Sequence, residues 1–308
     1  GVFGEVVRAQ GAYIHNLEPF WDHYWKNGEN DKLGWRLEYN MKHRGDVYAT
    51  HGLGPVAQAL DIHRGDRMKT LVAMDTKSVV GKSLVEERTG QPCENFRNGD
   101  HTTTLIRTEN GKVIEIQHDV MTPQPYNRLY QLTGTKGFAN KYPIAGYALD
   151  AKQLNASGVA PEVDNLNSHS FMPKKDMEAL VQKYQHPILK KYGEMAKEVG
   201  GHGGMDFIMD SRLVYCLQNG LPLDMDVYDL AEWCCLAELG ELSMDNNCAA
   251  VAFPDFTRGE WNKVKGYKHA YASPEDESVA MEKAKKITAK LKEKGAVEWA
   301  GEAVENKK

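Results

Sequence analysis

The stretch TTTLIRTENGKVIEIQH, residues 102–118, carries the clearest structural pattern in the chain. Two runs rich in β-branched residues flank the tetrapeptide at 109–112, and the Asn-Gly pair inside it is typical of a β-hairpin. In the second run, isoleucines alternate with polar residues, so one face of that strand is apolar and the other is polar. This alternation favours a half-solvated antiparallel sheet over a doubly wound parallel one.

The segments outside this hairpin complete an α+β pattern. Further strand-like stretches lie at 1–15, 68–75 and 128–132. Helical patterns lie at 52–60, 176–199 with a break near His186-Pro187, 205–217, 227–239 and, rich in Lys and Glu, 273–293. Residues 16–45 are predicted to form an aromatic-rich loop, and 150–170 an irregular polar connection. We therefore expect one mainly antiparallel sheet with helices.

Composition narrows the function classes. The chain has 308 residues, of which 41% are hydrophobic and 26% charged, which is typical of globular proteins. Its net charge of −5 gives no reason to expect a nucleic-acid partner. No apolar run approaches the roughly 20 residues of a membrane span. The five cysteines contain no C-x-x-C pair, which argues against a disulfide framework or a structural metal site.

A glycine-rich hexad, Gly52–Ala57, matches the G-x-G-x-x-A spacing of a dinucleotide-binding turn. That turn follows a buried strand, whereas residues 44–51 are mostly polar and charged. Pro55 also removes one of the amide donors that would face a pyrophosphate. The hexad is therefore interpreted as something other than a phosphate-binding turn.

Two pairs of side chains are candidates for proton transfer. Tyr48 and His51 lie three residues apart at a predicted helix start, where a phenol and an imidazole can face one cavity. Tyr13 and His15 share one face of the first strand. A structural histidine and an aromatic cross-strand pair are the alternatives for these two pairs.

Two further residues are candidates for substrate binding. Arg36 follows Trp35 in the aromatic-rich stretch and can donate several parallel hydrogen bonds to sugar or acyl oxygens; a surface ion pair is its alternative. Tyr126 follows Pro123-Gln124-Pro125, and these prolines restrict the chain that orients it.

Several motifs together resemble a known group of proteins. Gly4-Glu5-Val6, Gly134-Thr135-Lys136-Gly137 and Gly201–Asp206 resemble the C-terminal domain of the glucose–fructose oxidoreductase/inositol dehydrogenase (Gfo/Idh/MocA) superfamily. Within it, Tyr48–Ala57 and Phe253–Gly259 are similar to the signature of glycoside hydrolase family 109, the NAD-dependent α-N-acetylgalactosaminidases. The resemblance covers about residues 1–262.

The resemblance implies a domain organisation. Residues 1–262 would be a substrate-binding and catalytic α+β domain, with an open, predominantly antiparallel sheet and helices packed on one face. Residues 263–308 lie outside the resemblance, and their Lys- and Glu-rich sequence predicts a charged helical C-terminal extension. Family members carry an N-terminal Rossmann domain that binds NAD, so we expect this chain to be cut from a longer protein and to be inactive alone. The resemblance also implies a homo-oligomer formed through the open sheet face and an exported or periplasmic location, with a cytoplasmic one left open.

The resemblance also implies a reaction and roles for individual residues. NAD⁺ would oxidise C3 of a terminal α-N-acetylgalactosamine, a base would remove the C2 proton, the aglycone would leave, water would add, and the hydride would return. His51 is the first candidate for proton transfer and Tyr13 the second. Arg36, Tyr126 and the string Tyr48-Ala49-Thr50 would bind the carbohydrate, and His15 would approach the cofactor. An NAD(P)-dependent sugar dehydrogenase and a non-catalytic carbohydrate-binding module are the alternatives.

Overall fold

The computed structural model describes residues 1–17, 34–218, 220–263, 286, 289–290 and 293. Most of the predicted aromatic loop and nearly all of the predicted C-terminal extension lie outside these residues. The chain divides into two compact units, one made of 1–179 with 227–266 and the other of 180–226 with 267–308. The predicted domain boundary at residue 262 stays a prediction.

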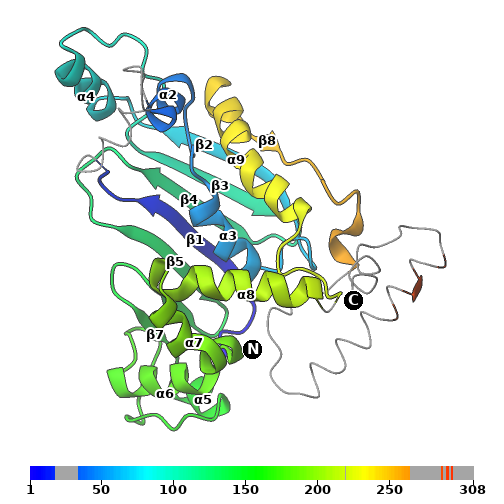
Figure 1. The fold of residues 1–308 in the computed structure, drawn as a ribbon. Helices are drawn as coiled ribbons and strands as arrows, with labels where there is room; N and C mark the ends of the chain where they lie inside the picture. The colour runs from blue at the N-terminus through cyan, green and yellow to red at the C-terminus, as the bar shows by residue number, and fades with distance from the viewer. Residues whose placement is uncertain (18–33, 219, 264–285, 287–288, 291–292, 294–308) are drawn as a thin grey trace. The chain divides into compact units, whose positions relative to one another are not determined.

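The first unit contains an open eight-stranded sheet, which confirms the predicted fold (Figure 1). The order across the sheet is β7-β6-β5-β1-β4-β3-β2-β8. The strands are β1 (Val6–Ile14), β2 (Met68–Asp75), β3 (Thr102–Thr108), β4 (Val113–Asp119), β5 (Asn127–Gly134), β6 (Phe138–Asn140), β7 (Gly146–Ala148) and β8 (Val251–Ala252). The predicted hairpin is β3–β4, in which Arg107 pairs with Val113 and Gly111 adopts a φ of +83°.

Every neighbouring pair in this sheet is antiparallel except β1 and β4, which run parallel. Their carboxyl ends therefore meet at one edge, where Tyr13 pairs with His118. Strand β5 is antiparallel to β1 and begins at the same edge, with Asn127 opposite Ile14. This edge collects side chains from three strands.

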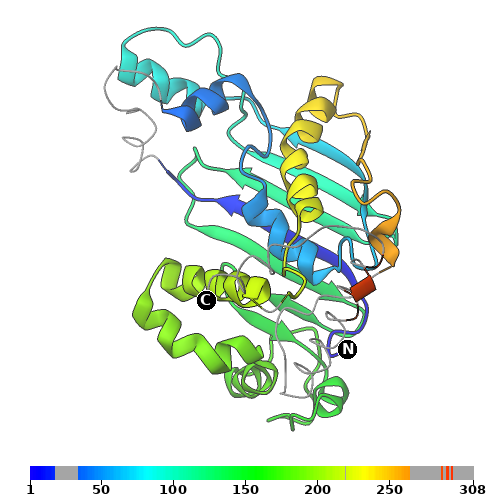
Figure 2. The same ribbon diagram turned by 45° about the vertical axis from the view of Figure 1, so that its right-hand side comes forward.

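Helices α3 (Thr50–Ala59) and α9 (Val227–Asp245) pack against one face of the sheet, as both ribbon views show (Figure 2). Their apolar side chains and those of the central strands form the main core, which includes Leu53, Leu71, Ile114 and Leu236. On the opposite face Leu105 stays exposed. No described helix combines the length and apolarity that crossing a membrane requires.

Helices α2 (Trp35–Lys42) and α5 (Ala151–Ala156) correct two predictions, because they lie in stretches that were expected to be irregular. Helix α2 has only eight residues and buries Leu37 and Asn40, which is too little to give a helical periodicity in the sequence. Helix α5 is capped by Asp150, whose carboxylate accepts a hydrogen bond from the backbone N–H of Gln153 at 2.7 Å. Helix α4 (Val80–Thr89) was also not predicted.

The predicted break at His186-Pro187 is confirmed, since α6 (Lys174–Tyr184) ends before it and α7 (Pro187–Val199) begins there. The second unit contains α7, a 3-10 turn at His202–Gly204 and α8 (Met205–Gln218), which pack against one another. Gly203 has a φ of +70° inside that turn, a backbone conformation that glycine adopts without steric cost.

Two glycines bring α3 against β1 at backbone distance. A Cβ atom on Gly11 of β1 would lie 2.0 Å from the carbonyl oxygen of Gly52, and one on Gly52 would lie 2.9 Å from the backbone nitrogen of Ala12. Both positions therefore exclude any side chain. Gly52 and Gly54 lie inside α3, so the hexad at 52–57 packs a helix against the sheet, and its interpretation as something other than a phosphate-binding turn is confirmed.

Gly11→Ala is expected to lower the free energy of unfolding by about 3 kcal/mol, because its methyl group would force the helix away from the strand. Gly193→Ala is the matched control, since a Cβ there meets open space in a helix and should add up to about 1 kcal/mol. Urea unfolding followed by circular dichroism measures both. Equal stabilities of Gly11→Ala and wild type would contradict the role given to this contact.

Candidate active site

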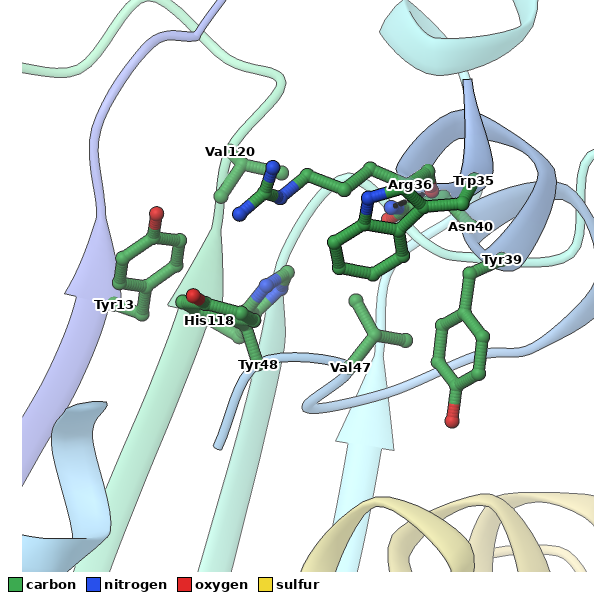
Figure 3. A pocket seen from close by; sticks show the side chains of 9 residues that line it. All are labelled: Tyr13, Trp35, Arg36, Tyr39, Asn40, Val47, Tyr48, His118 and Val120. Carbon is green, nitrogen blue, oxygen red and sulfur yellow. Dashed lines mark hydrogen bonds between the residues drawn. The ribbon is translucent and has the colours of Figure 1, made fainter. Parts of the chain in front are cut away.

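A cluster of aromatic and basic side chains lies at the shared edge of β1, β4 and β5. Helix α2, the segment before α3 and the start of α3 supply its other members, all within the first unit. Figure 3 shows Arg36 reaching from α2 toward Tyr13, with Tyr48 and His118 next to its guanidinium group. The cluster thus collects residues that lie far apart in the sequence.

Tyr13 is the centre of the ring contacts. Its ring centroid lies 4.7 Å from that of His15, 4.8 Å from Tyr48, 5.0 Å from His51 and 5.9 Å from His118. Tyr48 and His51 stack at 4.5 Å. The sequence prediction that each pair shares a face is confirmed, and the structure brings the two pairs together.

Arg36 is held beside this cluster by a buried amide network. Its guanidinium carbon lies 4.5 Å from the ring centroid of Trp35 and 5.7 Å from that of Tyr48. Asn40 donates to the carbonyl oxygen of Arg36 at 2.8 Å, and Asn98 donates to the side-chain oxygen of Asn40 at 2.7 Å. Both asparagines are buried, so these bonds fix α2 relative to the neighbouring loops.

The remaining predicted residues lie at different depths. Tyr126 is half exposed and contacts His15, with 5.5 Å between ring centroids. Ala49 is buried in the main core, where its side chain packs against apolar neighbours. Thr50 is partly exposed and begins α3. Substrate binding by Ala49 and Thr50 stays a prediction.

Sequence reasoning missed three members of the site. His118 is the penultimate residue of β4, a strand whose alternation indicated only a buried face. Tyr130 donates through its hydroxyl to the carbonyl oxygen of His51 at 2.6 Å, which ties β5 to the start of α3. Arg128 lies with its guanidinium carbon 4.6 Å from the ring centroid of Tyr13. The run of polar and aromatic residues at 126–130 was the available signal, but a backbone irregularity decides where those side chains point.

Burial sets the charge states of the site. It raises the pKa of Tyr13, as does Tyr48, while Arg128 and Arg36 act in the opposite direction. Burial and the nearby Arg128 lower the pKa of His15. Burial lowers the pKa of His118 to about 4, although Asp119 opposes this shift, so His118 is neutral at physiological pH.

A cavity of about 20 Å³ lies between Tyr13, Arg36, Tyr48 and His118. Such a volume holds about one water molecule. The Nε2 atom of His118 is buried and has no hydrogen-bond partner among the described residues. A polar atom of this kind is normally satisfied, so the cavity suits a small polar group.

The described side chains that line this cavity or contact the Tyr13 ring include no carboxylate. Asp46 lies nearby in sequence, but it is buried, and burial raises its pKa to about 7 against a 2.5 Å hydrogen bond from Thr104. The polar groups that this site offers are therefore phenols, imidazoles and guanidinium groups. These groups transfer protons and bind oxygen atoms, and their rings can stack on the apolar face of a sugar.

Comparisons with known proteins identify a family and a shared fold. Residues 1–263 match the family "Glycosyl hydrolase 109, C-terminal domain". Two proteins of Phocaeicola vulgatus, glycosyl hydrolase family 109 proteins 5 and 4, are each 85% identical over 100% and 98% of this chain, respectively. The chain spans 59% of the length of each. The solved structure of levoglucosan dehydrogenase with NADH and L-sorbose aligns with a TM-score of 0.50 at 15% identity, over 83% of this chain and 61% of that one, which shows a shared fold.

The neutral imidazole of His118 predicts a specific acid sensitivity. Below its ordinary pKa of 6.5 the unfolded chain takes up a proton that the folded protein, with a pKa of about 4, does not. Between pH 7 and pH 5 the wild type should lose about 2 kcal/mol that His118→Gln does not lose. Urea unfolding of both proteins at the two pH values measures this difference. Equal losses would show that His118 is not held neutral.

Proposed function

The chain belongs to the glycosyl hydrolase 109 family, and from this premise we propose that the full-length protein is an NAD-dependent glycosidase that cleaves terminal α-N-acetylgalactosaminides. The observation that carries the proposal is the cluster of Tyr13, Tyr48 and His51, whose rings lie within 5.0 Å of one another at the edge beside Arg36. Glycosidases commonly use two carboxylates, and NAD-dependent ones are exceptions. A site of phenols and imidazoles fits the exception.

In this scheme the described residues hold the sugar. The rings of Trp35 and Tyr48 offer apolar faces to sugar C–H groups. The guanidinium of Arg36 donates to hydroxyl or acetamido oxygens. Neutral His118 lines the cavity, and its Nε2 has no hydrogen-bond partner among the described residues, so it can accept or donate one further hydrogen bond according to its tautomer.

The residues present fit the nicotinamide end of the cofactor and not its phosphates. The Nε2 atom of His15 is buried without a partner among the described residues, so it is available to a bound group. The hexad at 52–57 cannot hold a pyrophosphate, because its glycines are packed against β1. When bound, NAD⁺ supplies a reversible acceptor for the hydride at C3 of the sugar. The rest of the cofactor would be held by the part of the relatives that this chain does not span.

The residues of this chain carry out the proton transfers. A C3 carbonyl makes the neighbouring C2–H bond acidic, and the phenol of Tyr13 or the imidazole of His51 accepts that proton as the aglycone leaves C1. Addition of water to C1, return of the proton to C2 and return of the hydride to C3 complete a net hydrolysis. The rings of Tyr13 and His51 are in contact, so either side chain can reach the same C2 proton of a bound sugar.

The proposal is tested with full-length protein and 4-nitrophenyl α-N-acetylgalactosaminide, following nitrophenolate and NADH absorbance together. Sustained nitrophenolate release without net NADH supports the glycosidase. NADH formed in proportion to substrate consumed supports the sugar dehydrogenase instead, and binding without either signal supports a carbohydrate-binding module. The chain 1–308 alone serves as a control and should be inactive.

His51→Ala in the full-length protein should lower kcat at least 100-fold, which is the usual cost of losing an acid–base group. His169→Ala is the matched control, since His169 lies on an exposed connection outside the site. Steady-state kinetics on the same substrate measures both variants. A kcat of His51→Ala within threefold of wild type would remove His51 from proton transfer and leave Tyr13 as the candidate.

A further inference from the structure

Arg128 lies between two phenols at the start of β5. Its guanidinium carbon is 4.6 Å from the ring centroid of Tyr13 and 5.1 Å from that of Tyr126. Its Nε donates to the hydroxyl of Tyr126 at 2.8 Å. Its Nη1 is buried and has no hydrogen-bond partner among the described residues. A guanidinium is always charged, so this geometry keeps a permanent positive charge against the Tyr13 ring.

The backbone beside Arg128 is strained in a way that serves this placement. Leu129 and Tyr130 have φ values of +55° and +50°, a conformation that is costly for residues with such side chains. The pairing of β5 with β1 shifts at this point, between Gln10 and Gly11 and again before Ile14. An irregularity of this kind re-aims side chains, and here it lies next to the residue whose guanidinium covers Tyr13.

We propose that Arg128 is a positioning residue that holds Tyr13 and Tyr126 in place and stabilises the phenolate form of Tyr13, so that Tyr13 is the group that takes the C2 proton. A cation on the face of a ring attracts a phenolate more strongly than a phenol, because part of the negative charge spreads into the ring. The assignment of the proton to C2 rests on the proposed function. The electrostatic coupling between Arg128 and Tyr13 does not.

The other groups that face Tyr13 come from α2, α3, β4, the residue after β1, the segment before α3 and the segment before β5. Burial, Tyr48 and Tyr126 raise the pKa of Tyr13, and Arg128 and Arg36 lower it. The ring contacts add three imidazoles, those of His15, His51 and His118. His118 is neutral at physiological pH, which leaves the two guanidinium groups as the permanent cations among these neighbours.

The coupling is measured on the full-length protein labelled with ¹³Cζ-tyrosine. The Tyr13 resonance is assigned by its loss in Tyr13→Phe, and its titration midpoint is compared in wild type, Arg128→Lys and Arg128→Met. Removing the charge should raise the midpoint by about one pH unit or more, and lysine should restore part of that shift. Arg8→Met is the matched control, because Arg8 lies on the same strand as Tyr13, β1, and forms an ion pair with Glu115. A Tyr13 midpoint in Arg128→Met within about 0.2 pH units of the wild-type midpoint would overturn the inference.

Kinetics then test the role in the reaction. In Arg128→Met the acid limb of the kcat/KM profile should move to higher pH together with the Tyr13 midpoint, while Arg128→Lys should lie between the two. An acid limb that stays fixed while the midpoint moves would overturn the assignment of Tyr13 as the proton acceptor. Full-length protein that titrates as expected but does not cleave the nitrophenyl substrate would overturn the proposed function and not the coupling. Circular dichroism of each variant confirms that it is folded.

Discussion

The contact between the backbones of β1 and α3 is the constraint on which the site depends. Gly11 and Gly52 meet where a single Cβ atom on Gly11 would lie 2.0 Å from a carbonyl oxygen. Tyr13 is two residues further along the same face of β1, and His51 is the neighbour of Gly52 on α3. The spacing of these two backbones therefore sets the 5.0 Å separation between the rings of Tyr13 and His51. Larger residues at this contact would move the strand away from the helix, and with it Tyr13 away from His51, the two side chains proposed for proton transfer.

The site combines neutral aromatic rings with positively charged guanidinium groups. Burial keeps His118 neutral and raises the pKa of Tyr13, while Arg36 and Arg128 supply positive charge from two different elements. Such an environment suits a proton transfer that passes through a transient anion, because the guanidinium groups are already in place before the anion forms. Carboxylates near the site, Asp46 and Asp119, are buried and hydrogen-bonded.

Much of the sheet and part of the site could be predicted from local patterns. The alternation in β4 and the Asn-Gly turn before it indicated the hairpin, and the three-residue spacing of Tyr48 and His51 indicated that these two side chains lie on the same side. The parallel pairing of β1 with β4 could not be predicted, because it joins segments whose sequences carry no mark of their partner. Helix α2 was missed because only two of its residues are buried. Arg128 was missed because its side chain is oriented next to a backbone irregularity, the left-handed residues 129 and 130. No local sequence pattern indicates that irregularity.

The parallel pair also determines when this site can exist during synthesis. Arg8 pairs with Val113, so β1 must wait for roughly a hundred further residues before its parallel neighbour is available, and closing so long a loop is slow compared with forming a hairpin. Strand β5, the other neighbour of β1, emerges later still. A nascent chain that ends before β4 contains Tyr13, Tyr48 and His51 but lacks both strands that flank β1. The ring cluster therefore forms late in synthesis. In an incomplete chain β1 has no partner strand, and an unpaired strand of this kind is prone to aggregation unless a chaperone binds it.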